Sequence, residues 1–220
     1  MPVRRLDASK SRLAPLLTPR ERAALTLAML RDVLSACERQ PEWHTWVISA
    51  DPVVLEVAVR AGARGVPDTA GTLLGAVHEV ERRTAGRASR LAILLADLPW
   101  ITADALRRAL EPADTVVGVR AASDGGTNLL VRRPPTVIPA RFGASSFERH
   151  EHAAARAGLV VRRADSEELA FDLDRPEDVG RMFASRRGGR ALDQCLEMGV
   201  GDRLRTMAVG GAERTPSAGG

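Results

Sequence analysis

Aromatic residues are scarce in this chain of 220 residues: tyrosine is absent and aromatics make up only 3%. Because single-stranded nucleic acids bind to stacked aromatic side chains, we expect no nucleic-acid partner. The two cysteines, Cys37 and Cys195, are too few for a disulfide framework and lack metal-binding spacing. Neither a membrane-spanning apolar run nor a secretory signal occurs, so we expect a protein of the reduced cytoplasm without a membrane partner.

Lysine is rarer still, since Lys10 is the one lysine among 32 basic residues and all the others are arginine. A coding bias explains the excess of arginine but does not explain why one lysine remains. An ammonium is a compact point charge that fits among phosphate oxygens, whereas the arginine fork is planar. The net charge of +4 suits a small anionic ligand. Lys10 is therefore a candidate functional cation.

Strand and helix patterns alternate along the chain. A continuous apolar run at 91–96 predicts a buried strand, and Thr18-Pro19 followed by Glu21 predicts a capped helix start. The alternation predicts an α/β domain with three layers and a mostly parallel sheet. The expected strands are 45–50, 64–67, 91–96, 114–119, 127–131, 159–162 and a short one at 169–173. The expected helices are 19–38, 54–61, 72–83, 102–110, 147–157 and a last one at 176–185.

The composition favours one domain over residues 1–208. Residues 209–220 are rich in glycine, alanine, serine and proline, so we expect a disordered tail there. A domain of this kind normally opens on a strand, but residues 1–5 are too short for more than its last few residues. The first strand is therefore either truncated, for example by a misplaced start codon, or a stub.

Three aspartates follow strand patterns, at the edge where open α/β sheets bind ligands. Asp97 follows the most apolar strand, while Asp172 and Asp174 alternate in Phe171-Asp-Leu-Asp-Arg-Pro176 and should face the same side. Carboxylates held together favour a cation between them, and Mg²⁺ commonly takes one or two of them plus phosphate oxygens. The residues thus predict one or two Mg²⁺ sites. The alternative is that Asp97 lies in a solvated turn or cap and Asp174 caps the next helix, which leaves Asp172 unexplained.

Three loops could approach an anion. Residues 9–12 precede the first helix, where α/β nucleotide binders hold phosphates, although the glycines of a Walker A motif are missing. Residues 124–127 and 142–147 are small-residue loops whose N–H and hydroxyl groups could contact an anion, or simply turns with helix caps. The histidines indicate no metal site, since His150 and His152 are two apart on an expected helix and face different sides.

Several short motifs occur in order over about residues 3–182. They are Lys10-Ser-Arg-Leu-Ala-Pro-Leu-Leu17, Glu21-Arg-Ala-Ala-Leu25, Ala28-Met-Leu-Arg-Asp-Val-Leu34, Ala96-Asp-Leu-Pro99, Asp124-Gly-Gly-Thr-Asn128, Phe142-Gly143, Ser146-Phe-Glu-Arg-His150 and Asp172-Leu-Asp-Arg-Pro-Glu-Asp178. As an ordered set they resemble the guanylyltransferases of coenzyme F-420 biosynthesis. The resemblance implies a GT-A-like nucleotidyltransferase fold, as in nucleotide-diphospho-sugar transferases. Two departures are the shortened first strand and Thr72-Leu-Leu-Gly-Ala76, which stands where the family often has Gly-Leu-Asn-Ala.

The resemblance also implies a reaction, the transfer of GMP from GTP to a small phosphorylated acid with release of pyrophosphate. Phosphoenolpyruvate is the expected acceptor, which would give enolpyruvyl-diphospho-guanosine, and 2-phospho-L-lactate and 3-phospho-D-glycerate are the alternatives. By the same resemblance Asp97, Asp172 and Asp174 would bind Mg²⁺. Lys10 and Arg12 would bind the nucleotide, with Lys10 and Asp97 the catalytic residues.

The acceptor site is implied in the same way, at Thr127, Gly143 and Ser146. Other readings stay open: a nucleotidyltransferase that acts on molybdopterin or a sugar phosphate, and a non-catalytic protein that binds nucleotide. The intact aspartates disfavour the non-catalytic reading. A homodimer remains open as well.

Overall fold

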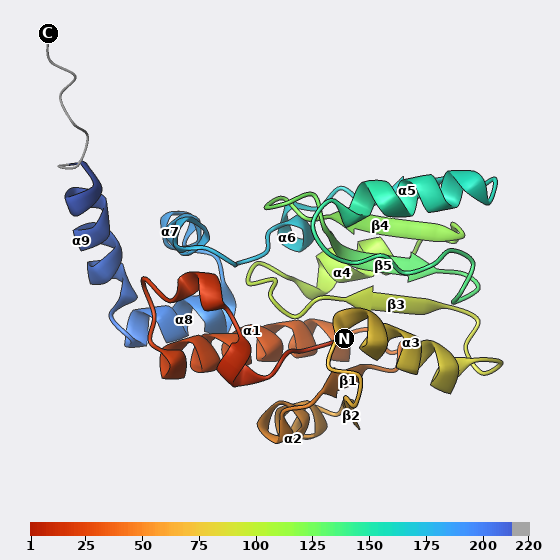
Figure 1. The fold of residues 1–220 in the computed structure, drawn as a ribbon, viewed down its shortest axis with the longest axis horizontal. Helices are drawn as coiled ribbons and strands as arrows, with labels where there is room; N and C mark the ends of the chain where they lie inside the picture. The colour runs from red at the N-terminus through yellow and green to blue at the C-terminus, as the bar shows by residue number, and fades with distance from the viewer. Residues whose placement is uncertain (213–220) are drawn as a thin grey trace, which may run out of the picture.

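The computed structural model describes residues 1–212, in which strands and helices alternate (Figure 1). The strands are β1 (Trp46–Ser49), β2 (Arg64–Pro67), β3 (Leu91–Leu94), β4 (Val116–Arg120), β5 (Thr127–Arg132) and β6 (Val161–Arg163). The α-helices are α1 (Pro19–Glu38), α2 (Pro52–Arg60), α3 (Leu73–Thr84), α4 (Ala103–Leu110), α5 (Ser146–Arg156), α6 (Glu167–Ala170), α7 (Pro176–Ser185), α8 (Gly189–Glu197) and α9 (Val200–Ala212), and two short 3₁₀ turns, η1 (Leu6–Ala8) and η2 (Ser11–Leu13), precede α1. Within this described part, no helix is long and apolar enough to cross a membrane.

The strands form two sheets. In the larger one the order is β3-β5-β4-β6, with β5 antiparallel to both neighbours and β4 parallel to β6. The smaller sheet pairs β1 with β2 in parallel. The predicted parallel arrangement therefore holds for β1 with β2 and for β4 with β6. The reversed strand β5 follows β4 through the turn at residues 121–126, which is too short for a crossover to a parallel strand.

The larger sheet is covered on both faces, which makes the three layers. Val117 and Val119 of β4 face α1, α4 and α6, whereas Val116 faces α3 and α5. This alternation is the period of two that a strand imposes on its side chains. At Gly118 the ring of Phe147 from α5 comes so close that a Cβ would lie 2.9 Å from its Cε2. Only glycine leaves room for that contact.

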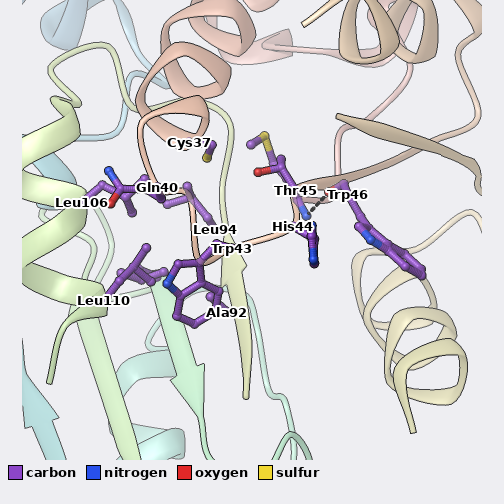
Figure 2. Close-up of a pocket in the computed structure, with 12 residues that line it drawn as sticks. Cys37, Gln40, Trp43, His44, Thr45, Trp46, Ala92, Leu94, Leu106 and Leu110 are labelled. Carbon is purple, nitrogen blue, oxygen red and sulfur yellow. Dashed lines mark hydrogen bonds between the residues drawn. The ribbon is translucent and has the colours of Figure 1, made fainter. Parts of the chain in front are cut away.

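The N-terminal segment lies along β1. The N–H of Val3 donates to the carbonyl of Ile48, and the N–H of Ile48 donates to that of Met1, both at 2.9 Å. The α-ammonium of Met1 donates to the carbonyl of Trp46, and burial lowers its pKa to about 6. The expected strand stub is thus a single bridge, between Pro2 and Ile48. An apolar pocket lies beside it, against β3 and α4 (Figure 2).

The C-terminal helices depart from the sequence predictions. The short strand expected at 169–173 is wrong, because Ser166 caps the single-turn helix α6 through the N–H of Leu169. Helix α7 lies where it was predicted but is not the last, since α8 and α9 follow it. The tail expected from residue 209 begins inside α9, and residues 213–220 lie outside the described part.

Helix α8 depends on a residue far away in the chain. Its cap residue Gly188 and its first residue Gly189 both have positive φ and supply no capping side chain. The carboxylate of Asp32 on α1 accepts from the N–H groups of Arg190 and Ala191 at 3.2 and 3.1 Å. Asp32 therefore caps α8 across 158 residues and attaches it to α1.

Replacing Asp32 with alanine should lower the free energy of unfolding by about 1–2 kcal/mol, because the first turn of α8 loses its cap. Urea denaturation measures the change. Asp193→Ala, at an exposed position of the same helix, is the matched control and should change stability by less than about 0.5 kcal/mol. Equal losses in both variants would contradict the capping role.

Candidate active site

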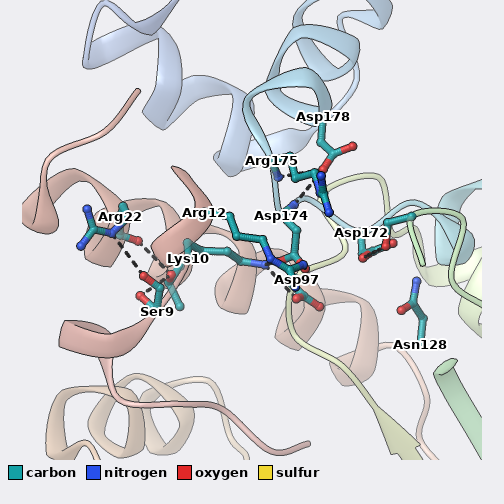
Figure 3. A network of polar contacts seen from close by, with 12 residues as sticks. Ser9, Lys10, Arg12, Arg22, Asp97, Asn128, Asp172, Asp174, Arg175 and Asp178 are labelled. Atoms are coloured by element: carbon teal, nitrogen blue, oxygen red, sulfur yellow. Dashed lines mark hydrogen bonds and ion pairs between the residues drawn. The ribbon is translucent and has the colours of Figure 1, made fainter. Parts of the chain in front are cut away.

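A buried lysine joins two of the predicted aspartates. The ammonium of Lys10 lies 2.8 Å from Asp97 Oδ2 and 2.8 Å from Asp174 Oδ1, and the side chain is only 7% exposed (Figure 3). Burial alone would lower the pKa of Lys10, but the two carboxylates outweigh it and raise the pKa above its usual value. The lysine is therefore firmly protonated. The one lysine in the chain thus holds together segments 87 and 164 residues away.

Lys10 is presented by a tight turn. Its φ of 50° places it in the left-handed region just before η2, and its carbonyl accepts from the N–H of Leu13 at 2.9 Å. The preceding residue is fixed as well, because Arg22 Nε of α1 donates to the carbonyl of Ser9 at 3.3 Å. Leu13 is fully buried against α1 and the C-terminal helices. The turn is anchored on both sides of the lysine.

The segment after α6 carries Asp172 and Asp174 as the alternation predicts. Phe171 and Leu173 are buried in the apolar cluster, where the ring of Phe171 stacks on Trp100 with centroids 3.8 Å apart. The N–H of Leu173 also donates to the carbonyl of Asp97 at 3.1 Å. With the apolar side chains turned inward, the aspartates face the other side, beside the end of β3.

Asp172 lies apart from the lysine, toward Asn128 (Figure 3). The hydroxyl of Ser123 donates to its Oδ2 at 2.6 Å. Burial, together with repulsion from Asp97 and Asp174, raises the pKa of Asp172 above its usual value. Sequence reasoning did not identify Ser123, because a serine at that position does not differ from an ordinary turn residue.

The residues suit a hard cation, although they do not form a finished cage for one. Among the described residues no three His, Cys, Asp or Glu side chains stand ready to hold a metal ion, and Lys10 lies between two of the carboxylates. However, Asp97 Oδ1 and Asp172 Oδ1 are buried without a hydrogen-bond partner. Mg²⁺ prefers such oxygens, and unpartnered buried carboxylate oxygens are costly. These two carboxylate oxygens therefore fit Mg²⁺.

The other predicted nucleotide residue, Arg12, is more loosely placed. Its Nη1 lies 3.5 Å from Asp174 Oδ2 and its side chain is 59% exposed. Exposed ion pairs of this kind contribute little to stability. Arg12 is thus free to turn toward an anion, whereas Lys10 is held.

The predicted acceptor residues form a second polar group at the start of α5. Thr127 Oγ1 lies 2.9 Å from Ser146 Oγ and 3.0 Å from His150 Nδ1, and all three residues are buried. Gly143 adjoins them, with a φ of 118° that favours glycine, and its carbonyl accepts from the N–H of Ser146. Ser145 occupies the cap position without a side-chain capping bond.

His150 is a further residue that sequence reasoning missed. Its spacing from His152 indicates no metal pair, whereas its spacing from Ser146 carries the signal. Those two are four residues apart, so they share one face of α5. The burial of His150 together with Arg132, Arg149 and Arg141 lowers its pKa to about 4.

A three-layer α/β fold with a basic turn and carboxylates beyond a strand end has the organisation of a nucleotidyltransferase. A solved structure of a nucleotide-diphospho-sugar transferase from Desulfovibrio desulfuricans G20 shares the fold, with a TM-score of 0.72 and 16% identity over 93% of this chain and 95% of that one. The chain belongs to the CofC-like guanylyl transferase family, whose model matches residues 1–201. It is therefore an enzyme that transfers a nucleotidyl group.

Relatives in this family carry different names. The phosphoenolpyruvate guanylyltransferase of Rubrobacter xylanophilus is 40% identical over 84% of this chain and 92% of its own. The 2-phospho-L-lactate guanylyltransferase of Methanothermobacter thermautotrophicus is 36% identical, over 88% and 86%. The 3-phospho-D-glycerate guanylyltransferase of Phenylobacterium zucineum is 35% identical, over 84% and 88%. The family thus fixes the type of transfer more tightly than the acceptor.

His150 should make the protein sensitive to mild acid. Histidine in an unfolded chain takes up a proton near pH 6.5, whereas His150 in the fold does so only near about 4. The unfolded state then binds more protons between these values, so the unfolding free energy falls as the pH drops from 6.5 toward 4.

His150→Asn should remove this part of the pH dependence, measured by urea denaturation at pH 7 and pH 5. His152→Asn, at an exposed position of the same helix, is the control and should keep it. If the unfolding free energy of His150→Asn changed between pH 7 and pH 5 as much as that of the parent, the His150 ring would not be the cause of the pH dependence.

Proposed function

We propose that the protein transfers GMP from GTP to phosphoenolpyruvate, with release of pyrophosphate, as a step of coenzyme F-420 biosynthesis. The observation that carries the proposal is the buried group of Lys10 with Asp97 and Asp174, beside Asp172. Phosphoenolpyruvate is favoured as acceptor because two relatives named for it, each 40% identical, lie above the relatives named for the other acids.

The chemistry needs positioning more than proton transfer. An oxygen of the acceptor phosphate forms a bond to the α-phosphorus of GTP, and the bond from that phosphorus to the bridging oxygen of the β-phosphate breaks. The attacking oxygen is already ionised, so no side chain has to act as a base. The obstacle is repulsion between two anions, which cationic and dipolar groups offset.

Lys10 has two positions in this proposal. Without nucleotide its ammonium neutralises Asp97 and Asp174, which would otherwise repel each other. With nucleotide it turns to the triphosphate, together with Arg12. Asp97, Asp172 and Asp174 would hold Mg²⁺, which would supply the charge neutralisation that lets two phosphates approach.

The acceptor binds at the start of α5. Thr127 and Ser146 offer hydroxyl groups, and Gly143 offers a backbone N–H. The hydroxyls are buried, so the acid must displace what covers them. Such donors orient the phosphate so that one oxygen points at the α-phosphorus.

Purified protein with GTP and Mg²⁺ should release pyrophosphate with phosphoenolpyruvate, and at least tenfold more slowly with 2-phospho-L-lactate or 3-phospho-D-glycerate. Asp172→Asn should lower the rate by at least a hundredfold, because a metal-binding carboxylate becomes a neutral amide while the shape is kept. The exposed Asp193→Asn is the matched control and should turn over like the parent.

Each contrary outcome is specific. Faster release with another of the three acids would reassign the acceptor. No release with any acid from folded protein would overturn the reaction. Full activity of Asp172→Asn at saturating Mg²⁺ would overturn the assignment of the metal site.

A further inference from the structure

Three polar side chains are packed against one another beneath the start of α5, with almost no access to solvent. Thr127 is 2% exposed, and Ser146 and His150 are each fully buried. Thr127 Oγ1 contacts both partners, Ser146 Oγ at 2.9 Å and His150 Nδ1 at 3.0 Å. Buried polar groups are costly unless each finds a partner. The direction of every hydrogen bond in this group therefore matters.

The far side of the histidine ring fixes the direction. The backbone N–H of Arg141 points at His150 Nε2, with a nitrogen–nitrogen distance of 2.9 Å. A backbone N–H can only donate, so Nε2 must accept and carries no proton. The neutral ring then has its proton on Nδ1, where it donates to Thr127 Oγ1. Burial and the nearby arginines favour this neutral ring.

Counting protons shows what this tautomer does. Thr127 and Ser146 have two hydroxyl protons between them, and the hydrogen bond that joins them uses one. Because the ring donates to Thr127, the second hydroxyl proton stays free. With the opposite tautomer Thr127 would have to donate to the ring and Ser146 to Thr127, and no hydroxyl proton would be left. The Arg141 N–H thus determines whether the pair can donate.

We propose that His150 is a positioning residue for the phospho-acid: through Arg141 and Thr127 it keeps one hydroxyl proton of the Thr127–Ser146 pair available to an oxygen of the bound anion. The inference rests on the proposed function, in which this pair holds the acceptor. Phosphate and carboxylate oxygens of an ionised acid only accept hydrogen bonds. A site whose hydroxyl proton is free to donate a hydrogen bond therefore favours an ionised acid as its ligand.

Two substitutions test the roles of the two ring nitrogens of His150 separately. His150→Asn places an amide at the Nδ1 position, so it can still donate to Thr127 while it loses contact with Arg141. His150→Gln places its amide at the Nε2 position, so it can accept from Arg141 while it loses the donor to Thr127. The exposed His152→Gln on the same helix is the control.

His150→Gln should raise KM for the phospho-acid at least tenfold, with KM for GTP unchanged. His150→Asn, whose amide Arg141 no longer orients and which can either donate to or accept from Thr127, should raise KM for the phospho-acid by a smaller factor. His152→Gln should leave both KM values within about threefold of the parent's. A merely structural role would instead lower kcat, or raise both KM values, in the two His150 variants alike. Equal effects of His150→Gln and His150→Asn on KM for the phospho-acid would overturn the inference.

The tautomer itself can be observed in the parent protein. Nitrogen-15 NMR of the histidine-labelled protein should show His150 with a protonated Nδ1 and an unprotonated Nε2, both free and with phosphoenolpyruvate, and the His150→Asn spectrum assigns the signal. A proton on Nε2 would overturn the inference and leave the proposed function standing. Parent protein that turns over none of the three acids would overturn the proposed function, and with it the role of His150.

Discussion

The ion pairs of one buried lysine with two aspartates hold this molecule's site in place. Lys10 contacts Asp97 and Asp174 at 2.8 Å from a position with almost no access to solvent. A charge buried in this way must be paired, since removing one partner leaves an uncompensated ion in a poor solvent. In the proposed reaction, the same contact occupies the place where a divalent cation would bind. In this proposal the position of one atom, Lys10 Nζ, therefore determines both how the two carboxylates are neutralised and whether they can bind a cation.

Apolar packing brings these charges together. Each charged segment carries buried neighbours: Leu13 follows Lys10, Trp100 follows Asp97, and Leu173 separates the aspartates of the third segment. All of these join one cluster with α1, α7, α8 and α9, distinct from the clusters on the two faces of the larger sheet. The C-terminal helices thus serve the site through apolar contacts, and Asp178 of α7 adds a carboxylate that accepts from the N–H of Asp174 at 3.0 Å. They complete the apolar cluster against which the three segments pack.

Local signals account for what the sequence predicts well. Helix α1 begins at Pro19 as predicted, because the capping box of Thr18 and Glu21 lies within four residues. Helix α8 could not be predicted, because its cap comes from Asp32 on another helix and its own first residues are glycines. The site shows the same difference between local signals, which the sequence reveals, and tertiary contacts, which it does not. The alternation of an extended segment predicts that Asp172 and Asp174 face the same side, and its being the one lysine of the chain singles out Lys10. The ion pairs themselves depend on tertiary packing and could not be predicted.

The central claim is that Lys10 takes the place of a divalent cation until nucleotide draws it away. Manganese binding to the nucleotide-free protein, followed by electron paramagnetic resonance, tests this most directly. Lys10→Met should bind Mn²⁺ at least tenfold more tightly than the parent, since it frees Asp97 and Asp174. Arg12→Met removes a charge from the same loop without a contact to Asp97 and should change the affinity by less than about threefold. Equal or weaker Mn²⁺ binding by Lys10→Met would contradict the account.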